Sequence, residues 1–302
     1  MFDKDSKTVF TLERDYSFTK YKVNYIPSEG VQPNQRNTAN NFPHNFQLVQ
    51  VGAAARVFMI GGGDFNLTPA SMYEAYELMF KPGTSSYDCL LKARMSYPRH
   101  GHSACAVSDT HILVTGSRKD IHRSSQKCEL YNIATNKWSE APMLNNGRHY
   151  HASCDFNGEY VYVFCGISNQ TKKYSNSIER LEIGLFMKSI TRAWKEIQLK
   201  DVKGNPFQLI ARQGLGASQF ANDSIMILGG FGGKYFDESL IFDPNTDTVV
   251  PTQSHLPQTV FPFAVPTIGS VEKNELITVD WTTFTVLIYK SDAWKAVAKL
   301  TK

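Results

Sequence analysis

A short pattern recurs along this chain: a run of apolar residues, then glycine, then an aromatic residue, a turn and a second large residue. The clearest copies end in runs of glycine, the weaker copies end in one glycine, and the last meets aspartate. The five copies reach this point at Gly62, Gly116, Gly166, Gly230 and Asp280. Self-similarity at a regular spacing is the signature of a repeat architecture, so it limits the fold before any single residue is considered.

The spacing between the copies identifies the kind of repeat. Taken as equivalent, the five positions are 54, 50, 64 and 50 residues apart, which is about the length of one four-stranded propeller blade. The apolar runs hardly alternate with polar residues, as expected of strands buried on both faces between neighbouring blades. Glycine after such a strand indicates close backbone packing or a positive φ angle.

Each copy has companions at similar offsets. An arginine opens the preceding strand at Arg99, Arg148 and Arg212, although the last copy has lost it. An aromatic residue, a turn and a large residue follow, as in Tyr131 to Trp138 and in Phe242-Asp243-Pro244. This set resembles the kelch repeat over residues 45–300. The resemblance implies an all-β, kelch-type β-propeller that binds other proteins through loops at the faces of its ring.

The whole chain, 1–302, is predicted to be one propeller domain, with approximate blades at 45–98, 99–147, 148–205, 206–256 and 257–302. The first 44 residues contain two strand-like segments, 8–12 and 18–23, and then a long polar loop. A closed ring commonly joins its first and last blades. We therefore expect six blades, with a partial N-terminal blade that a partner strand could complete, and five blades as the alternative.

The extra length in the third repeat lies around residues 184–207. A longer hairpin or an added loop is the plain interpretation. An apolar tip that serves as a docking loop is the functional alternative.

Composition narrows the classes of partner. A net charge of +4 is far below what a dedicated nucleic-acid binder carries. No run reaches 18 apolar residues, so we expect no membrane insertion, and the polar N-terminus predicts no secretory signal. The five scattered cysteines are expected to be reduced core thiols of a cytoplasmic protein.

Two sets of possible metal ligands occupy equivalent places in neighbouring repeats, His100, His102 and Cys105 and then His149, His151 and Cys154. Two histidines two residues apart on a strand share a face, whereas the cysteine points to the other one. The repeat alone explains the duplication, so we predict no metal and no cofactor. Enzymes with kelch-like propellers exist, including galactose oxidase and a bacterial sialic-acid mutarotase. A channel enzyme of the mutarotase or oxidase kind is therefore the alternative function, but the sequence supplies no clear acid–base pair, and we predict no catalytic residues.

The leading prediction is a non-enzymatic scaffold: a structural subunit of a larger, hetero-oligomeric cytoplasmic or cytoskeletal assembly, with a ciliary one as a more specific case. Basic loops of adjacent blades should meet at one rim of the ring and dock acidic protein surfaces. The candidate partner-binding residues are Arg118, Lys119, His122, Arg123, Lys172, Lys173, Arg99, Arg148 and Arg212.

Overall fold

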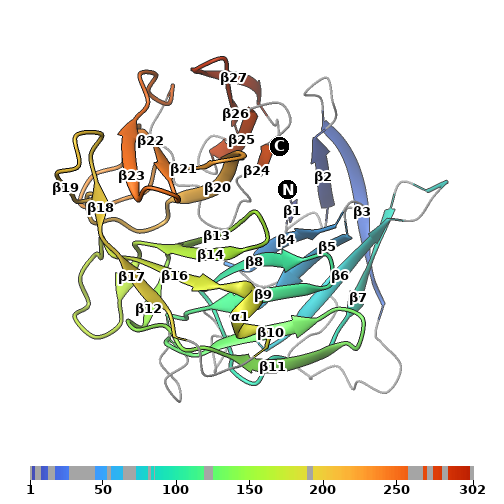
Figure 1. Cartoon of the computed structure of the whole chain (residues 1–302). Coiled ribbons are helices and arrows are strands. Elements are labelled where there is room, and N and C mark those ends of the chain that lie inside the picture. The colour runs from blue at the N-terminus through green and yellow to red at the C-terminus, as the bar shows by residue number, and fades with distance from the viewer. Residues whose placement is uncertain are drawn as a thin grey trace.

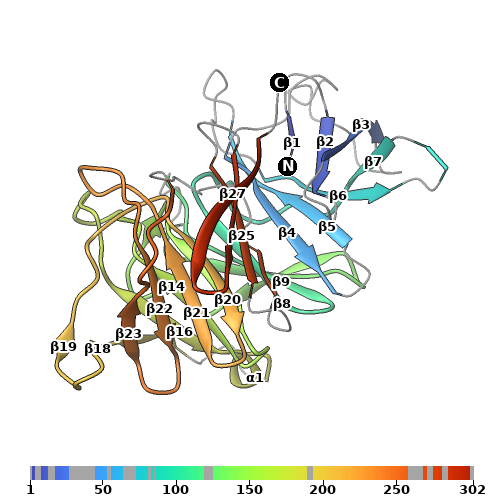
Figure 2. The same ribbon diagram turned by 90° about the horizontal axis from the view of Figure 1, so that it is seen from above.

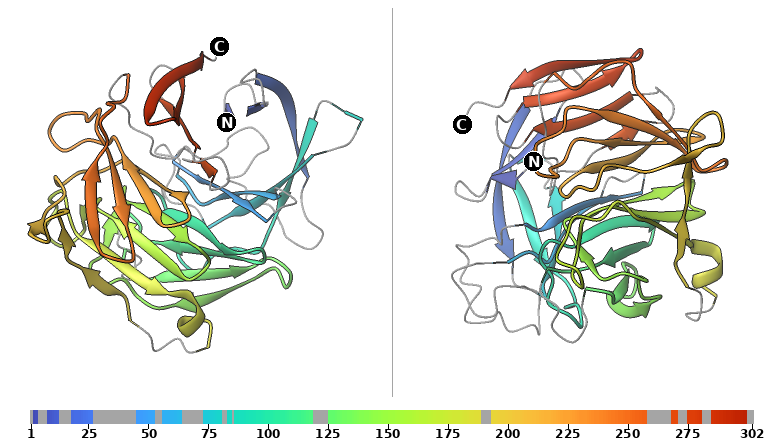
Figure 3. Two further views of the ribbon diagram at one scale, coloured as in Figure 1. Left: turned by 45° about the horizontal axis from the view of Figure 1, so that its top comes forward. Right: turned by 90° about the vertical axis from the view of Figure 1, so that its left-hand side faces the viewer.

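The described strands form five blades, each built on four antiparallel strands, that follow one another in chain order around a ring (Figures 1 and 3). The computed structural model describes residues 2–3, 8–12, 18–26, 45–52, 56–63, 73–80, 83–84, 86–118, 125–188, 193–257, 268–270, 275–280 and 285–299. All five blades are all-β, and the kelch-type propeller expected from the repeats is confirmed.

The first two blades and the last use consecutive strands. They are β4 (Gln47–Val51), β5 (Arg56–Ile60), β6 (Ala75–Phe80) and β7 (Ser86–Leu91); β8 (Ser103–Ser108), β9 (His111–Thr115), β10 (Cys128–Asn132) and β11 (Lys137–Ala141); and β24 (Ile268–Ser270), β25 (Glu275–Asp280), β26 (Thr285–Lys290) and β27 (Ala293–Lys299). In each blade the first strand is innermost.

The third and fourth blades carry additions. The third consists of β13 (Ala152–Phe156), β14 (Tyr160–Phe164), β16 (Ile178–Glu182) and β17 (Lys195–Ile197); the fourth consists of β20 (Gly216–Ala221), β21 (Ser224–Leu228), β22 (Ser239–Asp243) and β23 (Thr248–Pro251). A two-residue strand, β12 (Arg148–His149), pairs with β15 (Ile167–Ser168) at the end of the third blade. This short pair positions residues of the candidate site.

The N-terminal strands extend the first blade instead of starting a sixth. Strands β1 (Phe2–Asp3), β2 (Thr8–Leu12) and β3 (Phe18–Ile26) join the sheet at β7, where β3 runs parallel to β7 from Lys22↔Ser86 to Ile26↔Leu90. Figure 2 shows β2 and β3 standing beside β7. The described strands therefore give five blades, the alternative count. The two N-terminal strands were predicted correctly but placed wrongly, because backbone pairing to an open outer edge is not encoded in the apolar pattern. The polar stretch expected to form a loop, 27–44, lies outside the described residues.

The insertion in the third repeat is a helical turn and a hairpin. Helix α1 (Ile183–Phe186) follows β16, and the hairpin of β18 (Leu199–Lys200) and β19 (Pro206–Phe207) follows β17. Strand β18 runs parallel to β23 through the pair Lys200↔Thr248. The hairpin predicted for this region is present, and it extends the fourth blade beyond β23. Val202, near its tip, is 72% exposed.

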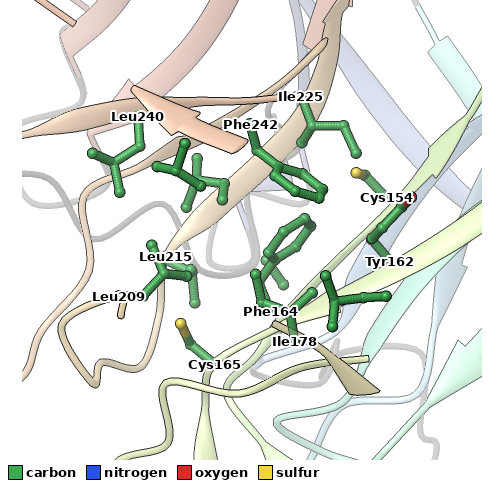
Figure 4. Close-up of a cluster of buried hydrophobic side chains, with 14 of the residues drawn as sticks. Cys154, Tyr162, Phe164, Cys165, Ile178, Leu209, Leu215, Ile225, Leu240 and Phe242 are labelled. Atoms are coloured by element: carbon green, nitrogen blue, oxygen red, sulfur yellow. The ribbon is translucent and has the colours of Figure 1, made fainter. Parts of the chain in front are cut away.

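The core lies between blades. On β14, Tyr162 and Phe164 pack toward the fourth blade, whereas Val161 and Val163 pack toward the second. Phe242 meets both aromatic rings edge-on, with centroids 5.4 Å from Tyr162 and 6.0 Å from Phe164 (Figure 4). Strands buried on both faces explain why the apolar runs do not alternate. All five cysteines are buried and free, and burial raises the pKa of each thiol.

Candidate functional site

Buried ion pairs support the loops at one end of the ring. Arg99 donates from Nε and Nη2 to Glu129 Oε2 at 3.1 and 3.0 Å, and from Nη1 to the carbonyl of Gly116 at 2.8 Å. Both side chains are at most 1% exposed. A buried charge is tolerated when it is paired and hydrogen-bonded, so this pair fixes the end of the glycine strand to its own blade.

The arrangement repeats in the next two blades. Arg148 pairs with Glu179 at 2.5 Å and donates to the carbonyl of Cys165 at 2.9 Å. Arg212 pairs with Glu238 and donates to the carbonyl of Gly229 at 3.2 Å. All three arginines are at most 1% exposed. Through these bonds the three arginines stabilise their blades. That any of them also contacts a partner directly stays a prediction.

The same arginines connect neighbouring blades through their backbone. The carbonyl of Arg99 accepts a bond from the N–H of Gly62, and the carbonyl of Arg148 accepts one from Ser117. Gly116 is thus equivalent to Gly61, one residue away from the alignment that the sequence suggested. The third repeat has Cys165 at this place, with a φ of 57°.

A buried histidine of the next blade explains why glycine stands at these positions. A Cβ on Gly61 would lie 2.7 Å from Cε1 of His102, and one on Gly116 would lie 2.5 Å from Cε1 of His151. Burial lowers the pKa of His102 to about 3, with the nearby Arg99 adding to the effect, and lowers that of His151 well below 6.5. Both rings are therefore neutral packing groups at neutral pH. No group of three or more metal-ligating side chains is assembled within the described part of the chain.

Arg118 projects from the end of the second blade. Its N–H donates to the carbonyl of His100, and its side chain is exposed. Its guanidinium lies 6.0 Å from the ring centre of Tyr150, with Nη1 3.4 Å from the hydroxyl. A cation above an aromatic face is held by the ring quadrupole, so Tyr150 orients this charge.

The loop of the third blade joins Arg118 through Asn169. Nδ2 of Asn169 donates to the carbonyls of Ser117 and Arg118 at 3.1 and 3.4 Å, and Oδ1 accepts from Nδ1 of His149 at 2.5 Å. Burial lowers the pKa of His149; the bond to Asn169 opposes this, and the charges of Arg118 and Lys172 lower the pKa further. Through Asn169, the loop that carries Lys172 thus contacts the end of the second blade where Arg118 lies, and the expectation that loops of adjacent blades share one rim is met. We call Arg118, Tyr150, Asn169, Lys172 and Lys173 the basic rim.

Of the other candidates, Lys173 is exposed next to Lys172, whereas Lys119, His122 and Arg123 lie outside the described residues. Sequence reasoning missed Asn169, whose role depends on contacts between blades. It also missed Tyr150.

Tyr150 has a φ of 53°, and the equivalent residues in the neighbouring blades are Gly101 and Gly214, with φ of 65° and 64°. A bulky residue in this conformation is a strained outlier, and such strain concentrates at functional sites. Its ring fills the space over Gly101, where a Cβ would lie 2.9 Å from Cε1 of Tyr150. The sequence did contain a signal that could have identified Tyr150. One Arg-His-x-His copy has tyrosine at the position where the other copy has glycine.

The ring of blades, the glycine strands and the buried arginines together define a kelch β-propeller. The family model described as "KLHDC2/KLHL20/DRC7 Kelch-repeats domain" matches residues 45–270, and the chain belongs to this family. It is also similar to human Kelch domain-containing protein 3, with 29% identity over 89 residues. That match covers 28% of this chain and 23% of the relative. No helix in the described part of the chain is long and apolar enough to cross a bilayer.

Proposed function

We propose that this propeller is a non-enzymatic protein-binding module, a structural subunit of a larger cytoplasmic or cytoskeletal assembly, with a ciliary one as a specific case. Kelch propellers are typically protein-binding scaffolds. The partner presents an acidic surface to the basic rim.

The observation that carries the proposal is that Asn169, in the loop that carries Lys172, bonds to the carbonyls of Ser117 and Arg118, so that two cationic loops of adjacent blades are joined. The 166–177 segment, which carries Lys172 and Lys173, contains no carboxylate that could neutralise these two lysines from within the segment. Complementary charge across an interface accelerates encounter and selects partners. Because Asn169 and Tyr150 hold the two loops in place, less conformational entropy is lost when a partner binds.

The chemistry around the inner strands favours a scaffold over an enzyme. Burial raises the pKa of Asp155 to about 6, which would suit a general base. However, its Oδ2 accepts from the N–H of Gly158 in its own turn. The nearby thiols of Cys105 and Cys154 have pKa values raised by burial, so they stay protonated and are poor nucleophiles.

The test is affinity purification from the native source followed by mass spectrometry. The wild-type chain is compared with Arg118→Glu/Lys172→Glu and with a matched control, Lys137→Glu/Lys195→Glu, which makes the same charge change at exposed sites on the outer strands. We expect the rim variant alone to lose its partners, with affinity falling about tenfold, which corresponds to about 1.4 kcal/mol. Equal recovery with both variants would refute the role of the rim. Turnover of a small molecule by the purified chain would refute the non-enzymatic assignment.

A further inference from the structure

Beside the basic rim, three aromatic side chains from two blades meet at the surface. The ring of Phe231 lies 6.1 Å from Tyr174 and 4.9 Å from Tyr235, both in edge-on contact at 81° and 62°. Tyr174 ends the loop that carries Lys172 and Lys173, so the aromatic group continues the rim toward the fourth blade. We call Tyr174, Phe231 and Tyr235 the aromatic notch.

The backbone holds the notch in shape. Phe231 and Gln213 exchange two N–H···O bonds, each 2.8 Å long, and Arg212 donates its N–H to the carbonyl of Ser175. A Cβ on Gly232 would lie 2.3 Å from the carbonyl oxygen of Ala211, so the loop lies directly against this segment. These bonds hold the backbone beside the three rings in place before any ligand arrives.

The notch is apolar and open. Tyr174 is 37% exposed and Tyr235 is 52% exposed. Exposed aromatic side chains from two separate segments therefore lie on either side of Phe231, which is a feature of interaction sites. Tyrosine is favoured at such sites because it buries a large area at a low cost in conformational entropy.

The charge around the notch is positive. Lys173 precedes Tyr174 and Lys234 precedes Tyr235, and both lysines are exposed. Of the two carboxylates on the same loop, Glu238 pairs with the buried Arg212, whereas Asp237 is 55% exposed and lies 3.5 Å from Nδ1 of His255, which is charged only when protonated. An apolar notch flanked by cations complements a segment that is both acidic and apolar.

We propose that the notch binds a bulky apolar side chain of an acidic peptide segment in the partner, while carboxylates of that segment lie along the basic rim. This rests on the proposed function and adds the anchor. The segment crosses from the second blade to the fourth, so that the anchor provides most of the affinity and the charges determine the orientation and the rate of encounter.

The probe is a phage-displayed library of random peptides selected on the full chain at low salt. The selection is repeated with three variants: Tyr174→Ala/Tyr235→Ala, Arg118→Glu/Lys172→Glu, and a control, Val202→Ala/Val250→Ala, that trims exposed apolar residues at the hairpin and the outer edge of the fourth blade. Thermal unfolding of each variant establishes that it folds. Selected peptides are then resynthesised with their apolar anchor replaced by serine.

We expect wild type and the control to enrich peptides that combine Asp or Glu with an aromatic or large aliphatic residue. Replacing that residue, or using the notch variant, should weaken binding about tenfold. Two outcomes would overturn the role of the notch but leave that of the basic rim intact: enrichment of acidic peptides without an anchor, or unchanged binding of anchored peptides to the notch variant. Anchored peptides without acidic residues would overturn the rim instead. A folded wild-type chain that enriches nothing would overturn both.

Discussion

Gly116 and Gly158 provide a matched test of the packing between blades. Both have a positive φ, 70° and 67°. A Cβ on Gly116 would lie 2.4 Å from the carbonyl oxygen of Arg148 and 2.5 Å from Cε1 of His151, whereas a Cβ on Gly158 would meet nothing within 4 Å. Alanine at either site therefore incurs the conformational cost, but only alanine at Gly116 collides with the next blade.

The expected magnitudes follow from these two terms. Placing a non-glycine residue in the left-handed region costs about 1–2 kcal/mol at both positions. Overpacking at Gly116 adds about 1–3 kcal/mol, since a backbone carbonyl cannot rotate away as a side chain can. Loss of chain entropy in the unfolded state is similar for both variants and cancels. The Gly116→Ala variant should thus be less stable than Gly158→Ala by about 2 kcal/mol.

Urea unfolding followed by tryptophan fluorescence measures this difference. The double variant Gly116→Ala/His151→Ala removes the clash with the ring but keeps the clash with the carbonyl. Its loss of unfolding free energy should therefore differ from the sum of the losses in the two single variants. Equal unfolding free energies for the two single variants would refute the close approach between the second and third blades.

Three further predictions concern buried charge, pH and strain. Glu179→Gln leaves Arg148 buried without a counter-charge and should destabilise the fold by about 3–5 kcal/mol; Glu140→Gln, 67% exposed, should have little effect, and similar urea midpoints would contradict this. The pKa of His102 falls from 6.5 to about 3 in the folded chain, so its neutral form contributes stability that is complete above pH 6.5 and is lost as the pH falls toward 3. His102→Gln should flatten the dependence of unfolding free energy on pH in that window, and an unchanged slope would be inconsistent with a neutral buried ring. Tyr150→Gly relieves a positive φ but removes the ring beneath the rim cation, so stability should change by less than about 1 kcal/mol while partner recovery falls; unchanged recovery would show that the ring does not matter for binding.

Much of the fold could be predicted from local patterns. Runs such as Val161–Phe164 lack alternation because each face packs against a different blade, and this is visible in the sequence. The arginines at Arg99, Arg148 and Arg212 were found as repeated residues. Their glutamate partners were not, because no fixed spacing links them: the ion pairs form across the blade, between residues 30, 31 and 26 positions apart.

The candidate site was less predictable. Arg118 and Lys172 could be identified as exposed loop charges, but Asn169 connects them only because the ring places two blades side by side. The aromatic notch was not found at all, since Tyr174 and Phe231 are 57 residues apart in the sequence and meet only at a boundary between blades.

By itself, the sequence determined the repeat, its all-β strands and the basic character of its loops, since each depends on the order of residues within one blade. Only the tertiary structure decided that the described strands form five blades and that the N-terminal strands extend the first. It also decided which loops share a rim. Those outcomes depend on backbone pairing at open sheet edges and on contacts between blades, and neither leaves a periodic trace in the chain.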